Sequence, residues 1–213
     1  MPATFNAASY ARGTAPDSFA VIFGVFSAAP TQVTLNSTIN ITPSLTSTSQ
    51  VNFLIPNSIA ASTIPTLTLY SGGNLIGAGT VAVNQYASAL YSANSSGQGL
   101  VNGQLLRIIN GQATYETLTV LGNTINPSTE NDYFILYGTG LRGPLPGVIT
   151  PPASLEFDGI SVPVLYVGPT PGVPGLDQVN AGPLGANLKN RINKNLRLTV
   201  GGLVANIVTA SLQ

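Results

Sequence analysis

The stretch Gly168-Pro-Thr-Pro-Gly-Val-Pro-Gly175 leads directly into Leu176-Asp-Gln-Val-Asn180. A loop this rich in proline and glycine, followed by alternating apolar and polar residues, predicts a turn that opens a short strand. The same triplet occurs earlier as Gln50-Val51-Asn52, and Phe53-Leu-Ile55 continues its alternation. Two copies of one strand predict two copies of one small β unit.

A second pattern is also repeated, and each copy precedes its Gln-Val-Asn strand. Phe19-Ala-Val-Ile-Phe23 ends at a glycine, and so does Tyr133-Phe-Ile-Leu-Tyr137. No window sustains the 3.6-residue periodicity of a long helix, whereas short β-branched runs between turn residues occur throughout. These patterns predict an all-β fold of two tandem immunoglobulin-like antiparallel β-sandwich units, joined by a hairpin-rich middle segment. We expect the units to span residues 1–110 and 111–213, with the boundary between 85 and 130.

Dipeptides that favour tight turns predict where the strands reverse. Asn-Gly and Asp-Gly are strong hairpin signals because both residues tolerate a positive φ. We expect hairpin turns at Gly72-Gly73, Asn102-Gly103, Asn110-Gly111, Asp158-Gly159 and Gly201-Gly202. The alternating run from Val33 to Ile41 is expected to form a single half-exposed strand.

Charge is scarce, and this excludes some classes of partner. Charged residues make up 7% of the 213, against about 25% in a typical soluble domain. Seven basic residues balance seven acidic ones, so no nucleic-acid partner is expected. The local cluster Lys189, Arg191, Lys194 and Arg197 is interpreted as a polar strand face or loop. The apolar or glycine run from Phe19 to Phe26 is far shorter than the roughly 20 residues that a membrane span requires, so no span is expected.

The chain has no histidine and no cysteine. Triads of the Ser-His-Asp or Cys-His type and the usual zinc sites are therefore excluded. Glu156 and Asp158 have a spacing compatible with a glycosidase pair, and Glu130 with Asp132 could offer oxygen ligands to calcium. Structural roles are the preferred interpretation of both pairs. We expect no enzyme, no cofactor and no metal.

Three Asn-x-Ser/Thr sequons make Asn36, Asn40 and Asn94 candidate glycosylation sites if the protein is exported. The first residues show no basic segment followed by an apolar one, so they contain no visible signal peptide. The sequence leaves the export route open.

Several motifs occur in the order of a known family: Ile22-Phe23-Gly24, Gln50-Val-Asn-Phe53, Tyr137-Gly-Thr-Gly-Leu141, Pro163-Val-Leu-Tyr166 and Pro174-Gly-Leu-Asp-Gln-Val-Asn180. The chain resembles, over nearly its whole length, the uncharacterised C-terminal domain family of acidobacterial (Solibacter-type) secreted proteins. This resemblance implies a bacterial β module at the cell surface or outside the cell, with no catalytic residues to transfer. One departure is Asp17, which stands where the family has glycine after Ala-Pro.

The leading hypothesis is an extracellular structural subunit whose partner is itself. A β-sandwich with so few charges should associate unless its sheet edges are protected. Head-to-tail exchange of a terminal strand would then build a homopolymeric fibre or surface layer, which could carry glycans. The candidate assembly residues are Ala3, Thr4 and Phe5 at one end, and Leu203, Val204, Ile207 and Val208 at the other.

The alternative hypothesis is a carbohydrate-binding or adhesive module with glycans as partners. Candidate stacking residues are Tyr86, Tyr91, Tyr137 and Tyr166. The amides of the two Gln-Val-Asn strands could also bind a ligand. We expect instead that they hold the neighbouring proline- and glycine-rich loops, whose backbone groups need partners.

Overall fold

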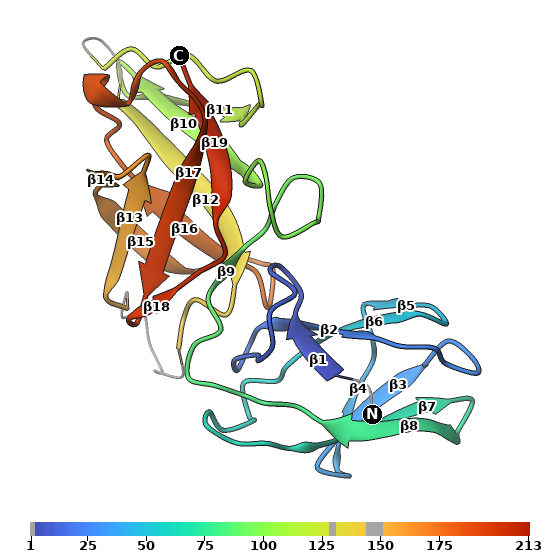
Figure 1. Ribbon diagram of the computed structural model, residues 1–213. Coiled ribbons are helices and arrows are strands. Elements are labelled where there is room, and N and C mark those ends of the chain that lie inside the picture. The colour runs from blue at the N-terminus through green and yellow to red at the C-terminus, as the bar shows by residue number, and fades with distance from the viewer. Residues whose placement is uncertain (1–2, 128–130, 144–150) are drawn as a thin grey trace.

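The computed structural model describes residues 3–127, 131–143 and 151–213. Its strands form four sheets, and these stack in pairs into two sandwiches that appear as two lobes in Figure 1. All strand pairs within the sheets are antiparallel. The described residues contain no α-helix, and one 3₁₀ turn occurs at Ala186–Leu188. The all-β sandwich predicted from the sequence is confirmed.

The first sandwich occupies the blue-to-green lobe of Figure 1. Its first sheet has the order β1 (Ala3–Asn6), β2 (Phe19–Phe23), β6 (Gln50–Leu54) and β5 (Leu45–Thr46). Its second sheet has the order β4 (Ile39–Ile41), β3 (Gln32–Leu35), β7 (Thr66–Ser71) and β8 (Asn74–Thr80). Alternate residues of both sheets point inward, as the two-residue period of a strand requires, and form a core that includes Phe53 and Leu69.

The second sandwich is larger. One sheet has the order β11 (Gln112–Thr117), β10 (Gly103–Ile109), β12 (Asn131–Thr139), β16 (Asp177–Ala181) and β15 (Val164–Pro169), and β9 (Ala89–Leu90) also pairs with β12. The facing sheet has the order β14 (Ile160–Val162), β13 (Ala153–Phe157), β17 (Arg191–Val200) and β18 (Leu203–Val204), and β19 (Val208–Leu212) also pairs with β17.

The two cores divide earlier in the chain than expected. Residues up to Val83 belong to the first core, and those from Tyr86 onward belong to the second. A boundary at 110 would cut the hairpin of β10 and β11. β10 lies in the second sandwich because it pairs with β12 along its length and buries Leu105 in that core. The division lies at the N-terminal margin of the expected 85–130 window.

The sequence repeat is a repeat in space as well. In the first sandwich β2 pairs with β6 so that Ile22 lies opposite Val51. In the second, β12 pairs with β16 so that Leu136 lies opposite Val179. Both copies therefore pair an aromatic–aliphatic strand with the Gln-Val-Asn strand in the same register.

The predicted turns are confirmed at four of five positions. Gly72-Gly73, Asn110-Gly111, Asp158-Gly159 and Gly201-Gly202 all adopt positive φ between paired strands. The fifth prediction, at Asn102-Gly103, is wrong because Gly103 begins β10, where a Cβ would lie 2.6 Å from the Ile135 carbonyl oxygen. The single strand expected from Val33 to Ile41 is also wrong, since positive φ at Asn36 and Ser37 turns it into a hairpin of β3 and β4.

Truncation of Phe134 tests the core of the second sandwich. The side chain is fully buried and packs edge-to-face on Phe157 at a centroid distance of 5.8 Å. We expect Phe134→Ala to lower the free energy of unfolding by about 3–5 kcal/mol in urea denaturation. The control Leu121→Ala removes a side chain that is 76% exposed, and it should change stability by less than about 0.5 kcal/mol. Equal losses in the two variants would contradict this assignment of the core.

Candidate functional site

The two sandwiches meet at a joint centred on Arg142. Its guanidinium lies between two carboxylates: Nε donates to Asp177 Oδ1 of the second sandwich, and Nη1 donates to Asp17 Oδ2 of the first. Asp177 is fully buried, and the Leu141 amide donates to its other oxygen at 2.7 Å. One arginine therefore links the loop before β2 to the first residue of β16.

Burial and the neighbouring groups have opposing effects on the pKa of Asp177. Burial raises the pKa of its carboxyl to about 6, although Arg142 and the Leu141 amide lower it. Asp17 has a φ of 56°, in the left-handed region that glycine adopts most easily and Asp tolerates. Glycine would fit this backbone equally well, but the carboxylate of Asp17 adds the contact with Arg142 that glycine cannot make.

A buried hydroxyl forms a second link across the joint. The Phe19 amide donates to Thr139 Oγ1 at 2.9 Å, and that hydroxyl donates to the Gly175 carbonyl at 2.7 Å. A Cβ on Gly175 would lie 2.5 Å from Leu54 Cδ1, and Gly175 has a φ of 81°, so glycine suits both this close approach to β6 and the backbone of the loop. The proline- and glycine-rich loop of the second sandwich thus packs against the first.

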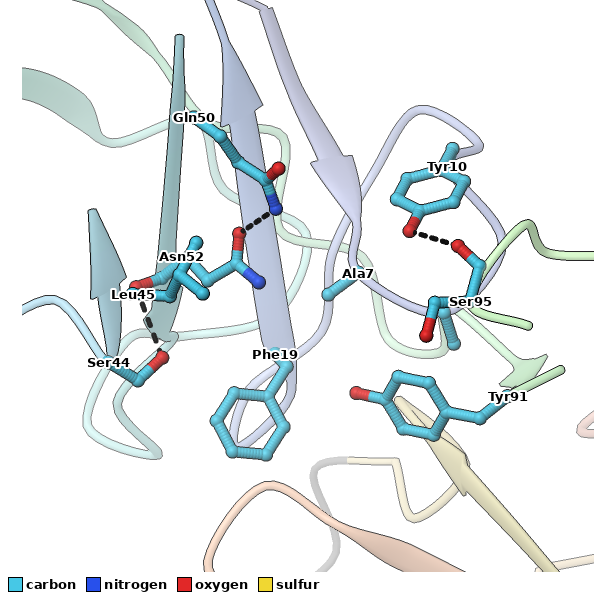
Figure 2. Close-up of a pocket in the computed structure, with 10 residues that line it drawn as sticks. Ala7, Tyr10, Phe19, Ser44, Leu45, Gln50, Asn52, Tyr91 and Ser95 are labelled. Carbon is cyan, nitrogen blue, oxygen red and sulfur yellow. Dashed lines mark hydrogen bonds between the residues drawn. The ribbon is translucent and has the colours of Figure 1, made fainter. Parts of the chain in front are cut away.

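A pocket of about 390 Å³ opens beside this joint. Figure 2 shows its rings and amides: Phe19, Tyr10 and Tyr91 surround an open space that also faces the amide side chains of Gln50 and Asn52. The remaining lining residues are Ala7, Ala8, Ser44, Leu45 and Ser95. None of these ten residues is charged. Because Tyr91 comes from the second sandwich and Gln50 from the first, the pocket requires both.

Hydrogen bonds fix the pocket walls while leaving polar groups unused. Gln50 Nε2 donates to Asn52 Oδ1 at 2.8 Å, and the Tyr10 hydroxyl donates to the Ser95 carbonyl at 2.6 Å. Among the described residues, Gln50 Oε1 and Asn52 Nδ2 have no protein partner. Burial raises the pKa of Tyr91 well above its usual range, so its hydroxyl remains protonated. The lining offers neutral donors, neutral acceptors and aromatic faces, which suit binding.

The predicted tyrosines lie in three different environments. Tyr91 lines the pocket, whereas Tyr86 packs in the second core. Tyr137 and Tyr166 lie half-buried on the outer face of the β12–β16–β15 sheet. Phe19 and Tyr10 were missed by the sequence analysis. One signal in the sequence could have found Phe19. Alternation directs Gln50 and Asn52 away from the core, and Phe19 lies on the same outer face of the sheet as Asn52.

The amides do not hold the loops, contrary to expectation. Gln50 donates to Asn52, and Gln178 donates to Asn180 at 2.6 Å, so each pair bonds within its own strand. Thr139 and Arg142 hold the proline- and glycine-rich loop instead.

The acidic residues considered for catalysis or calcium have cationic partners. Asp158 pairs with Arg191 and lies 3.8 Å from Lys194 Nζ, and Glu156 lies 3.6 Å from Arg197. Three residues of the basic cluster, Arg191, Lys194 and Arg197, thus lie on β17, and Lys189 lies just after the 3₁₀ turn that precedes this strand. Asp132 is buried against Arg107 at 2.9 Å, and Glu130 lies outside the described residues. Within the described ranges, no group of three or more acidic side chains is placed to hold a metal.

The three sequon asparagines are all exposed. Asn36 Oδ1 accepts from the Thr66 amide, Asn40 Oδ1 from Gln32, and Asn94 Oδ1 from Ser96. In the described part of the chain, the Nδ2 atoms of all three lack a protein partner. Glycosylation of these residues stays a prediction.

The candidate assembly residues mostly pair within the same chain. Ala3, Thr4 and Phe5 form part of β1, which pairs with β2. Leu203 and Val204 form β18 and Val208 begins β19, and both strands pair with β17, whereas Ile207 lies between them and is exposed. Strand exchange would have to break these pairs, and self-assembly stays a prediction. Among the described residues, no helix has the length and hydropathy needed to cross a membrane.

Comparisons with known proteins do not identify a family for this chain. No protein-family model and no curated protein matches the chain. Among solved structures, it is similar to the Bacteroides ovatus SGBP-B of a mixed-linkage glucan utilization locus, solved in complex with a mixed-linkage heptasaccharide. The similarity has a TM-score of 0.36 at 13% identity, covering 94% of this chain and 43% of that one. The chain therefore spans less than half of that protein, and its function is inferred from the site itself.

Removal of Arg142 tests the joint. Arg142→Ala would leave the buried Asp177 carboxylate without its cationic partner, which costs about 3–5 kcal/mol of stability in comparable cases. Arg197→Ala is the matched control, because its ion pair with Glu156 is about half exposed on both sides and should contribute less than about 1 kcal/mol. Chemical denaturation measures both, and a loss no larger for Arg142→Ala than for the control would refute this role.

The raised pKa of Asp177 predicts a pH dependence. The folded protein binds a proton at this carboxyl up to pH about 6, and the unfolded chain only up to its ordinary 3.8. The resulting stability is fully present below the unfolded pKa and is lost as pH rises through 6. Asp177→Asn should lack this contribution, so its stability relative to wild type should improve from pH 4 to pH 7. Parallel stability curves for the two proteins would contradict the shifted pKa.

Proposed function

We propose that the protein is a non-enzymatic carbohydrate-binding module that acts outside the cell or at its surface. The observation that carries this proposal is the pocket at the joint, with its three aromatic rings, its Gln50–Asn52 amide pair and no charged lining residue. Pockets that combine aromatic surface with a few convergent polar groups are typical ligand sites.

Sugar rings have the chemistry that this lining complements. Their C–H faces pack on aromatic rings, and their hydroxyls both donate and accept hydrogen bonds. Phe19 and Tyr91 supply the rings. The unused Gln50 Oε1 accepts a hydroxyl proton, and Asn52 Nδ2 donates to a hydroxyl oxygen.

The neutrality of the pocket favours a neutral saccharide. An anionic sugar would exchange its hydration for a site without any cation among its lining residues, which is unfavourable. The whole chain adds no long-range attraction, because its seven basic and seven acidic residues cancel. Binding should therefore vary little with salt.

Removal of the amide pair tests the proposed site. A panel of soluble polysaccharides should show binding of at least one neutral polymer, such as a β-glucan, xylan or mannan, over alginate and heparin. Gln50→Ala with Asn52→Ala should weaken that binding about tenfold, equivalent to about 1.4 kcal/mol, in calorimetry. The matched control is Gln32→Ala with Asn40→Ala, which removes a second amide pair, bonded at 2.9 Å on another sheet.

Two results would overturn the proposal. One is the absence of binding to every neutral polymer by a folded wild-type protein. The other is an equal loss of affinity in the control, because the second pair lies on the β3–β4 strands and contributes nothing to the pocket.

A further inference from the structure

The Gln50–Asn52 amide pair that lines the pocket belongs to a strand arrangement that recurs in the second sandwich. In the first, Phe23 lies opposite Gln50 on adjacent strands; in the second, Tyr137 lies opposite Gln178. Two residues further along the Gln-Val-Asn strand, Asn52 lies opposite Val21 in the first sandwich, and Asn180 lies opposite Ile135 in the second. Both sheets thus direct a Gln/Asn pair and a neighbouring aromatic residue away from their cores.

From this repeat we propose that the outer face of the β11–β10–β12–β16–β15 sheet is a second saccharide-binding surface, which rests on the proposed function of the pocket. We call it the tyrosine face. By register and alternation its aromatic and amide residues are Tyr115, Gln104, Tyr133, Tyr137, Gln178, Asn180 and Tyr166. The apolar Ile135, which is 4% exposed, lies on the same face between Gln104 and Asn180.

The Tyr166 ring lies over a glycine of its own strand. A Cβ on Gly168 would lie 2.5 Å from Tyr166 Oη and 2.6 Å from Cζ, so the ring occupies the space that any side chain at 168 would need. The Tyr166 hydroxyl donates to the Pro169 carbonyl at 2.8 Å and fixes the end of the ring. An aromatic ring over a strand glycine covers the exposed backbone. The Tyr166 side chain is half-buried, so part of it remains exposed to a ligand.

Amides with unused groups lie next to this ring. Asn180 lies opposite Tyr166 on the adjacent strand, and Gln178 Nε2 donates to Asn180 Oδ1. On the other side, the Tyr137 hydroxyl donates to Gln104 Oε1 at 3.2 Å. Gln178 Oε1, Asn180 Nδ2 and Gln104 Nε2 have no protein partner among the described residues. Rings and amides therefore alternate across the sheet.

The tyrosine face is long and uncharged. It extends over five strands to Tyr115, which is 60% exposed. With about 4.8 Å between strands, this distance is about 19 Å. The charged side chains of these strands, Arg107, Glu116, Asp132 and Asp177, fall on the opposite face by alternation.

These features favour an extended neutral saccharide chain as the occupant. A saccharide carries hydroxyls along its whole length, so it can satisfy amides that recur across the sheet while its C–H faces stack on the rings between them. A second copy of the chain would bury these amide groups and would have to match each one with a partner.

Stoichiometry and avidity test this proposal in the full chain. With a short oligosaccharide of the neutral polymer that the wild type binds, calorimetry should give two sites. Gln178→Ala with Asn180→Ala, and separately Tyr166→Ala, should each leave one site. On an immobilised long polymer, either variant should lose at least tenfold in apparent affinity because binding changes from bivalent to monovalent. Tyr166→Phe keeps the ring and should bind like wild type.

The outcomes distinguish the two proposals. No binding by wild type would overturn both. One site in wild type, lost on removal of Gln50 and Asn52 and unaffected by Gln178→Ala with Asn180→Ala, would overturn only the tyrosine face. A concentration-dependent dimer that Tyr166→Ala dissociates, seen by sedimentation, would assign this face to a second copy instead.

Discussion

The buried carboxylate of Asp177 is the constraint on which the arrangement of the two sandwiches depends. A charge without exposure to water must be paired, and the nearest cation is Arg142, whose other contact is Asp17 in the first sandwich. The same few residues also place Thr139 between the Phe19 amide and the Gly175 carbonyl. These links hold Tyr91 of one sandwich beside Gln50 and Phe19 of the other. The pocket is a consequence of the joint, so a loss of the Arg142 contacts would affect both stability and binding.

One strand pair occurs twice in the chain and forms two related surfaces with different surroundings. The register of β2 with β6 is repeated by β12 with β16, and both copies turn a Gln/Asn pair outward. In the first copy Tyr91 of the neighbouring sandwich lies beside the pair and completes a pocket, whereas in the second copy the pair lies among tyrosines of its own sheet. The polar groups on both proposed surfaces are uncharged amides and hydroxyls, which is consistent with the low charge of the chain. A neutral surface of this kind suits sugars and does not require self-association to account for it.

The outward direction of the Gln-Val-Asn side chains could be predicted from the sequence, because alternation along a strand is a local property. Their hydrogen bonds could not. The same locality explains the success at Asn110-Gly111 and the failure at Asn102-Gly103: both dipeptides favour a turn, but the close approach of β12 keeps Gly103 in a strand. The strand of Phe19 is apolar throughout, so its sequence does not distinguish Phe19 from a core residue, and only the facing Tyr91 marks it as part of a pocket.

The sequence by itself determined the all-β fold, the repeat and four of the five predicted hairpin turns, since these depend on alternation and on backbone preferences of neighbouring residues. It also determined that no histidine or cysteine chemistry is possible. Only the tertiary structure decided that the cores divide between Val83 and Tyr86, that Asp17 and Asp177 share one arginine, and that Tyr166 lies on Gly168. The joint joins residues more than 100 positions apart, and the tyrosine face depends on the order of strands in a sheet. Contacts between residues so far apart in the sequence arise from packing, which no local sequence pattern encodes.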